Sequence, residues 1–532
     1  MTNLTRHVAF VSLLALASIA LQAAPASCDS LAKLNLPNFT VKTAETVPAG
    51  SFTPPGNSAL NGLPAFCRVA GMIKPSADSD IEIEVWMPSA DWNGKFEGIG
   101  NGGYAGSIGY GAMAAAVIHG YATAATDTGH HAGATDATWA LGHPEKVTDF
   151  GYRAIHETAE KAKAIIHGFY GEAPKRSYFS SCSNGGRQAL MEAQRFPADY
   201  DGIVAGAPAY NWTHLLTTAA YNLTALLNDP ASYIPATKLP AIEAANLEAC
   251  DALDGVKDGV IDDPTVCHPN LSKLLCSGAE TNSCLTAPQI AALEKLYGGL
   301  KGVKGEQIFP GYSPGGENGM GGWGGWITGG AREKSLQYAF GTNFFQNMVY
   351  SDAKWDYHTF SADRDMKVAD DTSAGKLNAT NPDLKKFKDR GGKLIIYHGW
   401  SDAAIPPMST VIYYQNVVTK MGAKDSAVFV RLFMVPGMQH CGGGPGPNSF
   451  GQGAVTGGDP MHDVDAAIQR WVEKGTAPEQ IIATKYKGLN PASGVERTRP
   501  LCKYPQVAKY NGSGNTDDAA NFSCADKGVA AK

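Results

Sequence analysis

Ser183 lies in a segment whose pattern is typical of a nucleophilic serine. The stretch RSYFSSCSNGGRQALMEAQRF predicts a strand, a sharp turn at Ser183 and then a helix, with Gly185 and Gly186 directly after the serine. This is the layout of a nucleophile elbow, G-x-S-x-G, except that Ser181 takes the place of the first glycine. A serine in a glycine-rich turn is also a common structural feature. To act as a nucleophile, Ser183 needs a base to accept its proton and an acid to orient that base.

Residues of both required types occur later in the chain, each after a predicted strand. Asp402 follows the strand 393–399 in GWSDAAIPP, and His440 follows a strand that ends near Val435 in VPGMQHCGGG. The carboxyl ends of strands in an open α/β sheet build its binding sites, and the order Ser, Asp, His is that of α/β-hydrolases. Singly, Asp402 is interpretable as a turn residue and His440 as a loop histidine. Their joint placement favours a catalytic triad with Ser183 for acyl transfer.

A second glycine-rich segment, GIGNGGYAG at 98–106, has the G-x-G-x-x-G spacing of a dinucleotide-binding loop. Asp127, at the end of the next strand-like run, falls about where such folds place a ribose-binding acid. A dinucleotide-binding loop must open a helix, however. Gly106, Gly109 and Gly111 would each cost a helix roughly 1 kcal/mol relative to alanine, so we expect a loop after this strand.

Acyl transfer gives this glycine segment a different use. Negative charge develops on the carbonyl oxygen of the tetrahedral intermediate, and two N–H donors are needed to stabilise it. One is expected from Asn184, directly after the serine, and the other from a loop that follows an early strand. We expect Gly102 or Gly103 to supply the second donor.

The elements that would position these residues form two blocks. Strand-like runs at 81–87, 95–100, 121–127 and 176–181, with an amphipathic helix at 147–169, make the first; runs at 393–399 and 427–435 and a helix at 464–473 make the second. This alternation predicts an α/β fold with a mostly parallel sheet. Between the blocks the pattern changes to short helices, clustered cysteines and GGENGMGGWGGWITGG, which indicates an inserted domain or lid.

The N-terminus has the layout of a cleavable secretory signal. Arg6 and His7 precede the apolar stretch VAFVSLLALASIAL and the small residues QAAPAS, with cleavage expected between Ala23 and Ala26. A membrane anchor would need about 20 apolar residues, and a lipoprotein site at Cys28 lacks the usual aliphatic residue before it. The expected division is a signal peptide at 1–25, the two parts of one domain at 26–205 and 391–532, and the insertion at 206–390. The protein is expected to be secreted or periplasmic.

Ten cysteines follow the predicted signal, and five disulfides are the default expectation in an oxidising compartment. Neighbouring positions suggest the pairs Cys28–Cys67, Cys250–Cys267, Cys276–Cys284 and Cys502–Cys524, which leaves Cys182 and Cys441 for each other. Zinc is the competing interpretation, but the chain has no C-x-x-C motif. Because Cys182 precedes Ser183 and Cys441 follows His440, their disulfide would tie the serine turn to the histidine loop.

The segments CSNGGRQ and GMQHC, with their linking cysteines, resemble the tannase and feruloyl esterase family, and the resemblance covers essentially the whole mature chain. Members of this family include feruloyl esterases, tannases and mono(2-hydroxyethyl) terephthalate hydrolase. The resemblance implies an α/β-hydrolase fold with a large inserted lid domain. It also implies Ser183, Asp402 and His440 as the triad and the five cysteine pairs given above.

Asp251, Asp254 and Asp258 lie close together in CDALDGVKDGVID, an oxygen-rich setting of the kind that Ca²⁺ favours. The spacing is not that of an EF-hand, and acidic turns are commonly just solvated. The family resemblance implies that such a loop binds calcium through these aspartates and the backbone carbonyls of Val256 and Val260. A structural Ca²⁺ and no organic cofactor are therefore expected.

The composition and the insertion bear on the substrate. A net charge of -6 over 532 residues, with no run of five like charges, gives no footprint for nucleic acid or an anionic membrane, so a small or neutral partner is expected. The insertion offers aromatic rings for stacking on a planar acyl group, although any one of them could equally be core. The residues expected near the substrate are Trp323, Trp326, Phe340 and Arg332, with Phe344, Phe345 and Lys334 in the same region.

These features together predict a secreted serine carboxylesterase that acts on esters of aromatic acids. Hydroxycinnamoyl esters of the feruloyl type, such as those derived from plant cell walls, are the expected substrates. A tannase that cleaves galloyl esters and a hydrolase of terephthalate monoesters are the alternatives within the class. A non-catalytic protein that binds a phenolic ligand is the alternative outside it.

Overall fold

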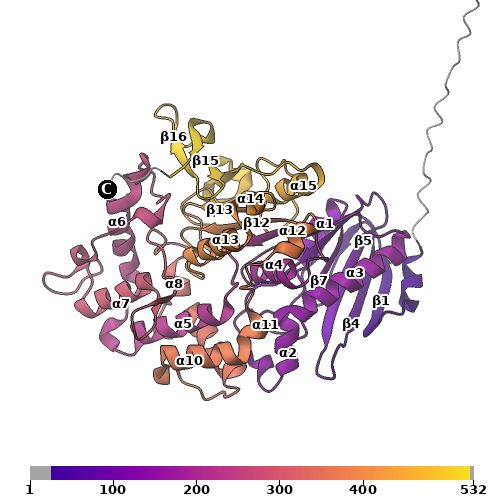
Figure 1. Ribbon diagram of the computed structural model, residues 1–532, viewed down its shortest axis with the longest axis horizontal. Helices are drawn as coiled ribbons and strands as arrows, with labels where there is room; N and C mark the ends of the chain where they lie inside the picture. Colours follow the sequence, from indigo (N-terminus) through magenta and orange to yellow (C-terminus); the bar gives the residue numbers. More distant parts are fainter. Residues whose placement is uncertain (1–25, 528–532) are drawn as a thin grey trace, which may run out of the picture.

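A computed structural model describes residues 26–527, so the predicted signal peptide lies outside the described residues (Figure 1). A nine-stranded sheet has the order β1-β4-β5-β7-β6-β8-β9-β12-β13. The pairs from β1 to β7 are antiparallel, and the pairs from β7 to β13 are parallel. The strands are β1 (Phe39–Val47), β4 (Phe66–Ile73), β5 (Ile81–Pro88), β6 (Lys95–Ile99), β7 (Ala122–Thr126), β8 (Arg176–Cys182), β9 (Gly202–Gly206), β12 (Lys393–Gly399) and β13 (Val430–Val435).

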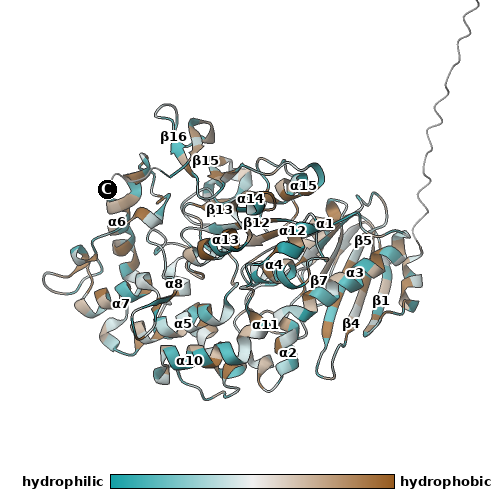
Figure 2. Ribbon diagram, in the orientation of Figure 1, coloured by the Kyte–Doolittle hydropathy of each residue, from teal (hydrophilic) through white to brown (hydrophobic). Residues whose placement is uncertain are grey.

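Helices cover both faces of the sheet, as the predicted α/β class requires. Alternate residues of β12 show the two faces. Leu394 and Ile396 pack in the core cluster with α3 (Ala154–Tyr170) and α13 (Pro407–Met421), whereas Ile395 and Tyr397 pack with α15 (Val464–Lys474). Figure 2 shows both hydrophilic and hydrophobic positions along α3, which is consistent with one buried face. The helices of this part are α1 (Tyr110–Ile118), α2 (Pro144–Thr148), α3 (Ala154–Tyr170), α4 (Asn184–Arg195), α13 (Pro407–Met421), α14 (Ala423–Ala427) and α15 (Val464–Lys474).

The chain leaves the large sheet after Gly206 and returns to it at Lys393. We call residues 207–392 the insertion; most of its helices lie on the side of the molecule opposite β1 and β4 (Figure 1). It has an apolar cluster of its own, although Leu384 and Phe387 near its end pack in the sheet core. Its elements are α5 (Trp212–Leu227), α6 (Leu239–Cys250), α7 (Ala287–Gly298), β10 (Leu300–Lys301), β11 (Gln307–Phe309), α8 (Trp323–Trp326), α9 (Leu336–Asn343), α10 (Ala362–Ala369), α11 (Gly375–Leu377) and α12 (Lys385–Asp389).

The remaining strands form two-stranded hairpins outside the large sheet. They are β2 (Gly50–Phe52) with β3 (Leu60–Leu63), β14 (Gln480–Tyr486) with β15 (Val495–Cys502), and β16 (Val507–Tyr510) with β17 (Phe522–Ala525). The ten cysteines form the five predicted disulfides. No helix within residues 26–527 has the length and apolar character needed to span a membrane.

Three expectations about local structure need correction. The strand predicted at 427–435 begins at Val430, because α14 ends at Ala427 and the parallel register with β12 starts where Leu394 faces Val430. The loop expected after the glycine segment ends at Gly109, and α1 follows despite Gly111. Burial of the apolar face of α1, including Met113 and Val117, offsets the low helix propensity of that glycine. The predicted helix at 147–169 is interrupted by a π-helical turn, Asp149–Arg153, between α2 and α3.

Candidate active site

The turn at Ser183 has the strained geometry of a nucleophile elbow. Ser183 lies between β8 and α4 with φ 66° and ψ −123°, a conformation that L-residues rarely adopt. A Cβ atom at Gly185 would lie 1.9 Å from Ser181 Oγ, and one at Gly186 would lie 2.2 Å from the carbonyl oxygen of Gly206. Ser181 therefore fits where the common motif has glycine because its neighbour Gly185 has no side chain.

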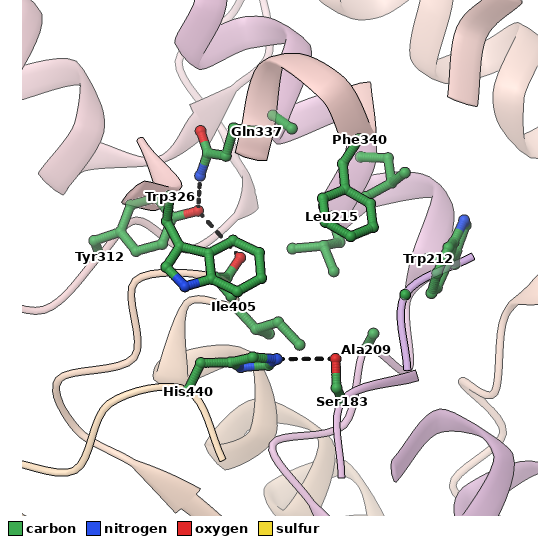
Figure 3. A pocket seen from close by; sticks show the side chains of 14 residues that line it. Ser183, Ala209, Trp212, Leu215, Tyr312, Trp326, Gln337, Phe340, Ile405 and His440 are labelled. Atoms are coloured by element: carbon green, nitrogen blue, oxygen red, sulfur yellow. Dashed lines mark hydrogen bonds between the residues drawn. The ribbon is translucent and has the colours of Figure 1, made fainter. Parts of the chain in front are cut away.

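The structure brings the three predicted triad residues together at the carboxyl ends of β8, β12 and β13. His440 Nε2 lies 2.9 Å from Ser183 Oγ (Figure 3), and His440 Nδ1 lies 2.8 Å from Asp402 Oδ2. Both distances are those of hydrogen bonds. The arrangement allows His440 to accept the serine proton on Nε2 while its Nδ1–H donates a hydrogen bond to the Asp402 carboxylate.

Asp402 is 2% exposed, and its two carboxylate oxygens are surrounded by donors. Oδ1 accepts from the backbone amides of Ala404 (2.7 Å) and Ile405 (2.9 Å), and Oδ2 lies 3.1 Å from His398 Nε2 as well as against His440. Burial by itself raises the pKa of Asp402. The positive charge that His440 can carry and the hydrogen bonds from both histidines outweigh burial, and they hold this pKa well below its ordinary value.

His398 was not among the residues predicted from the sequence. It is fully buried at the end of β12, where its Nδ1 atom lies 2.7 Å from Thr410 Oγ1 and its Nε2 atom faces Asp402. Its place at the end of a strand, four residues before Asp402, was a usable sequence signal. We infer that His398 is a positioning residue that acts through Asp402.

The two proposed oxyanion donors lie on different elements beside Ser183. Asn184 is the first residue of α4, and the N–H groups in the first turn of a helix have no intrahelical partner. Gly103, with φ 57°, lines the same pocket as Ser183, and a Cβ there would lie 2.3 Å from the carbonyl oxygen of Ala134. Gly102 is not among the described residues that line this pocket. The geometry therefore favours Gly103 over Gly102.

The Cys182–Cys441 disulfide joins the residues next to the serine and the histidine, with 6.0 Å between the Cα atoms. Cys441 has φ 63°, and Ser183, next to Cys182, also has a positive φ. Each end of the cross-link is therefore at or next to a residue in a left-handed conformation. Such conformations cost of order 1–3 kcal/mol each and persist only where the surroundings enforce them. The disulfide contributes to that enforcement across 259 residues of sequence.

The pocket beside the triad is mainly apolar and aromatic, and most of its lining comes from the insertion. Trp326 packs edge-on against the His440 ring with 5.1 Å between centroids, and it stacks with Phe340 at 6.0 Å. Gln337 lies across the pocket from the Ser183–His440 pair and donates to the hydroxyl of Tyr312 (Figure 3). The lining consists of Gly103, Ser183, Ala209, Trp212, Leu215, Leu216, Ala219, Tyr312, Trp326, Gln337, Phe340, Ala404, Ile405 and His440.

Two of the four residues predicted near the substrate, Trp326 and Phe340, line this pocket, and the other two do not. Trp323 is buried against Tyr297 and Tyr312 in the core of the insertion. Arg332 is on the surface, where its guanidinium donates to the backbone oxygen of Leu227 at 2.8 Å. The hydrogen-bond partner of Arg332 is thus a backbone carbonyl 105 residues earlier in the chain rather than an anionic substrate group.

The other candidates from the insertion are also placed away from the pocket. Phe344 and Phe345 are fully buried in an apolar cluster, and Lys334 is exposed. The lining residues that sequence reasoning missed include Trp212, which comes soon after the carboxyl end of β9, and Ile405, three residues after Asp402. Both therefore had the same strand-end signal that located the triad.

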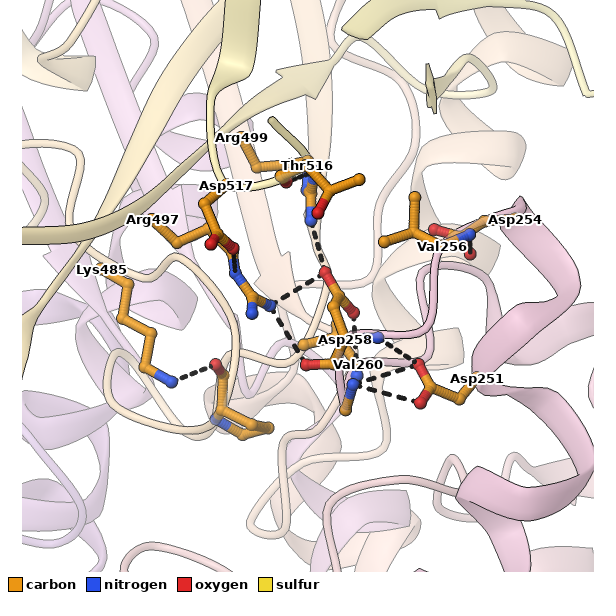
Figure 4. Close-up of polar contacts among 12 residues, drawn as sticks. Asp251, Asp254, Val256, Asp258, Val260, Lys485, Arg497, Arg499, Thr516 and Asp517 are labelled. Carbon is orange, nitrogen blue, oxygen red and sulfur yellow. Dashed lines mark hydrogen bonds and ion pairs between the residues drawn. The ribbon is translucent and has the colours of Figure 1, made fainter. Parts of the chain in front are cut away.

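The acidic loop holds the predicted aspartates in different surroundings. The carboxylate of Asp258 faces Arg497 (2.9 Å) and Arg499, and Asp251 Oδ1 accepts from the backbone amides of Asp258 and Gly259 at 3.1 Å each (Figure 4). Within residues 26–527, the sets of three ligand side chains that converge within 4.8 Å do not include Asp251, Asp254 and Asp258 together.

A buried oxygen beside this loop is nevertheless suited to a cation. Asp262 Oδ2 is buried without a hydrogen-bond partner among the described residues. Burial and the negative charges of Asp254 and Asp258 raise the pKa of Asp262 to about 8, although Arg499 opposes them. The oxygen-rich donor set, with Val256 and Val260 in the same loop, fits Ca²⁺ in its chemistry. Binding would require Asp258 to share its carboxylate with the ion and the arginines.

A hydrogen-bonded Ser–His–Asp arrangement at the strand ends of this sheet defines the chain as an α/β-hydrolase. The sequence model of the tannase and feruloyl esterase family matches residues 67–525, and the chain belongs to that family. It is accordingly a carboxylic ester hydrolase, which sets aside the alternative of a non-catalytic binding protein.

Several relatives match almost end to end. An uncharacterised esterase of Xanthomonas campestris pv. campestris is 44% identical over 94% of this chain and 92% of its own. A probable feruloyl esterase B-1 of Aspergillus oryzae is 33% identical over 94% and 93%. The crystal structure of feruloyl esterase B from Aspergillus oryzae matches with a TM-score of 0.86 at 33% identity, covering 94% of this chain and 99% of that one. The tannin acyl hydrolase of Aspergillus niger, at a TM-score of 0.73 and 23% identity, shares the fold.

Proposed function

We propose that this esterase hydrolyses esters of hydroxycinnamic acids through an acyl-enzyme on Ser183. The observation that carries the proposal is the hydrogen-bonded series Ser183–His440–Asp402 opening on a pocket lined by aromatic side chains. A planar aryl acid has the shape and polarity that such a pocket accommodates. The relatives named as feruloyl esterases are consistent with this substrate class.

The proposed reaction follows from the positions of the three side chains. Ser183 Oγ attacks the ester carbonyl carbon as His440 Nε2 takes its proton, and the amides of Asn184 and Gly103 stabilise the resulting oxyanion. The imidazolium then gives the proton to the departing alkoxide, which leaves as the alcohol. A water molecule, deprotonated by His440, attacks the acyl-enzyme and releases the hydroxycinnamic acid and free Ser183.

The pocket favours a hydroxycinnamate over the two alternatives within the class. No lysine or arginine is among the described residues that line it, so the second carboxylate of a terephthalate monoester would be buried without a cation, which is costly. A galloyl ring carries three hydroxyl groups, whereas the hydrogen-bonding side chains that the described lining offers away from the triad are Gln337, Tyr312 and the indole N–H groups of Trp212 and Trp326. The single phenolic hydroxyl of a feruloyl group could be hydrogen-bonded by Gln337 and Tyr312, whereas three galloyl hydroxyls would need more partners.

The test is kcat/KM for methyl ferulate, methyl gallate and mono(2-hydroxyethyl) terephthalate under one set of conditions. The proposal expects methyl ferulate to be the best of the three. A preference of about tenfold or more for either competitor, roughly 1.4 kcal/mol in transition-state binding, would overturn the substrate assignment and leave the esterase assignment in place.

We further propose that the acidic loop binds a stabilising Ca²⁺ and that the protein acts outside the cytoplasm, on esters from plant cell walls. Five disulfides support an oxidising location.

The calcium proposal is tested by chelation. Prolonged chelation should lower the melting temperature, because a ligand that binds only the folded state stabilises it, and restored Ca²⁺ should reverse the change. Asp254→Asn should reduce the response to Ca²⁺. A protein purified without chelator that contains no calcium and has an unchanged melting temperature would contradict the calcium proposal.

A further inference from the structure

Glu82, Asp127 and His131 form a compact cluster outside the active site. Glu82 lies on β5, Asp127 directly follows β7, and His131 lies in the loop after it. Their ligand atoms all lie within 4.8 Å of one another, with Glu82 Oε2 at 3.4 Å and Asp127 Oδ2 at 3.8 Å from His131 Nε2. Asp127 is the residue whose sequence position suggested a ribose-binding acid, a role that an ester hydrolase does not need.

Asp127 is buried, and only one of its two carboxylate oxygens accepts hydrogen bonds from the described residues. Oδ1 accepts from the backbone amides of Glu82 at 2.9 Å and Gly129 at 2.8 Å. Oδ2 is equally buried, faces His131, and has no hydrogen-bond partner within residues 26–527. Burial raises the pKa of Asp127 to about 7, against the lowering effect of the two amides. A buried oxygen without a partner is destabilising, so this atom is suited to a ligand.

The distances in the cluster suit a metal ion better than a shared proton. Separations of 3.4 and 3.8 Å are longer than the hydrogen bonds that a protonated histidine would make to a carboxylate. Four ligands at about 2.0–2.1 Å from a tetrahedral zinc ion lie roughly 3.3 Å from one another. The His131 side chain is 74% exposed, so its ring is free to make the small adjustment that coordination needs.

The neighbouring cations leave the facing atoms of the cluster accessible. Lys42 Nζ pairs with the other oxygen of Glu82, Oε1, at 2.7 Å. Lys146 Nζ donates to the backbone oxygen of Gly129 at 3.0 Å and lies 3.9 Å from Asp80 Oδ2. Glu82 Oε2, Asp127 Oδ2 and His131 Nε2 therefore remain as three convergent ligand atoms.

We propose that Glu82, Asp127 and His131 bind a divalent transition-metal ion of the Zn²⁺ class, with water as the fourth ligand. An imidazole nitrogen with two carboxylates is a donor set suited to zinc and its neighbours, whereas Ca²⁺ and Mg²⁺ prefer oxygen ligands alone. The site is separate from the acidic loop and takes a different metal.

The loop that carries His131 also supports the glycine segment of the active site. Gly106 donates its amide to the backbone oxygen of Ala132 at 3.1 Å, and Tyr104 donates to that of Ala134 at 2.8 Å. Ala134 is the residue against which Gly103 packs so closely that a Cβ would not fit. An ion held by His131 would therefore tether the backbone that supports the proposed oxyanion donor.

Isothermal titration of the full mature protein with Zn²⁺, in buffer that contains excess Ca²⁺, tests the site directly. Wild type should bind one Zn²⁺ that the excess Ca²⁺ does not displace, and its melting temperature should rise by roughly a few degrees at saturation. His131→Ala and Glu82→Gln should each weaken binding by more than about tenfold, since each removes one of three protein ligands. His358→Ala is the matched control, because His358 is an exposed histidine 2.7 Å from Asp356 Oδ1.

The proposal is overturned if wild type binds no Zn²⁺ or if Ca²⁺ displaces it. It is equally overturned if both variants bind Zn²⁺ as tightly as wild type, or if His358→Ala loses as much affinity as His131→Ala. Because the readout is metal binding, failure here leaves the esterase assignment unaffected, and inactive esterase preparations do not affect this result.

Discussion

The pocket beside Ser183 has two walls of different origin. We call the residues at the ends of β8, β12 and β13, with Gly103, the sheet wall, and the side chains supplied by residues 207–392 the insertion wall. The sheet wall is polar and closely hydrogen-bonded: each oxygen of Asp402 has two donors within 3.1 Å. The insertion wall is mainly apolar, and its hydrogen-bonding groups are those of Gln337 and Tyr312 and the indole N–H groups of Trp212 and Trp326.

We expect the sheet wall to carry out the reaction and the insertion wall to determine which esters are accepted. The triad residues follow the ends of parallel strands, and a disulfide links the serine turn to the histidine loop, so their mutual distances depend little on the insertion. In the proposed reaction, in contrast, the acyl group of the substrate would meet mainly α5, α8 and α9, which supply most of the pocket lining. Changes in the sheet wall should therefore lower kcat for every ester, and changes in the insertion wall should alter the ranking of esters.

The largest effect is expected from Ser183→Ala. Removing the nucleophile should lower kcat by roughly 10⁴–10⁶-fold for all substrates, because the triad acts as a unit. The melting temperature should stay close to that of wild type. Ser181→Gly, which restores the common elbow sequence, is the control and should retain activity. Near-normal turnover by Ser183→Ala would show that Ser183 is not the nucleophile.

Asp402→Asn should lower kcat by about 10⁴-fold, because an amide at this position favours the wrong tautomer of His440. His398→Gln should have a smaller effect of the same kind, through the orientation of Asp402. Both should act on kcat with little change in KM. Stopped-flow or steady-state kinetics on one chromogenic ester would measure kcat and KM separately. A change in KM alone in either variant would contradict the roles assigned to Asp402 and His398.

The double substitution of Cys182 and Cys441 by alanine should weaken both function and stability. Loss of a native disulfide commonly costs about 2–5 kcal/mol of stability, and here it also releases the strained backbone at both catalytic loops. We expect kcat to fall by more than product binding does. Alanine substitution of the Cys276–Cys284 pair, which closes a short loop in the insertion, is the control. Equal losses of kcat in the two double variants would argue against a special role for the first pair.

Gln337→Leu should change selectivity more than catalysis. If Gln337 and Tyr312 receive the phenolic hydroxyl, the variant should lose about tenfold in kcat/KM for methyl ferulate, because one hydrogen bond is worth about 1 kcal/mol or more in a buried site. It should lose much less for methyl cinnamate, which lacks that hydroxyl. Measuring both esters with both proteins gives the coupling directly. A parallel loss on the two esters would show that the effect is on packing alone.

The two walls also differ in how far the sequence revealed them. Ser183, Asp402 and His440 were predictable because each follows a strand with a recognisable apolar pattern, and flanking cysteines linked two of them. Trp323 and Arg332 could not be separated from Trp326 and Phe340 in the same way, since which aromatic ring of an irregular insertion faces a pocket depends on contacts between distant segments. The pairing of Arg332 with the backbone of Leu227, 105 residues earlier, has no local signature. His398 was not predicted because the run 393–399 was interpreted only as a strand, although the place of this histidine four residues before Asp402 was a usable signal.

Covalent labelling of the nucleophile tests the central claim most directly. Wild type treated with a fluorophosphonate should gain the mass of one label per chain as esterase activity is lost, and peptide mapping should place that label on Ser183. Ser183→Ala should gain no label, and His440→Ala should react far more slowly because the serine has lost its base. Loss of activity with the label on another residue, or full activity after stoichiometric labelling of Ser183, would contradict the account.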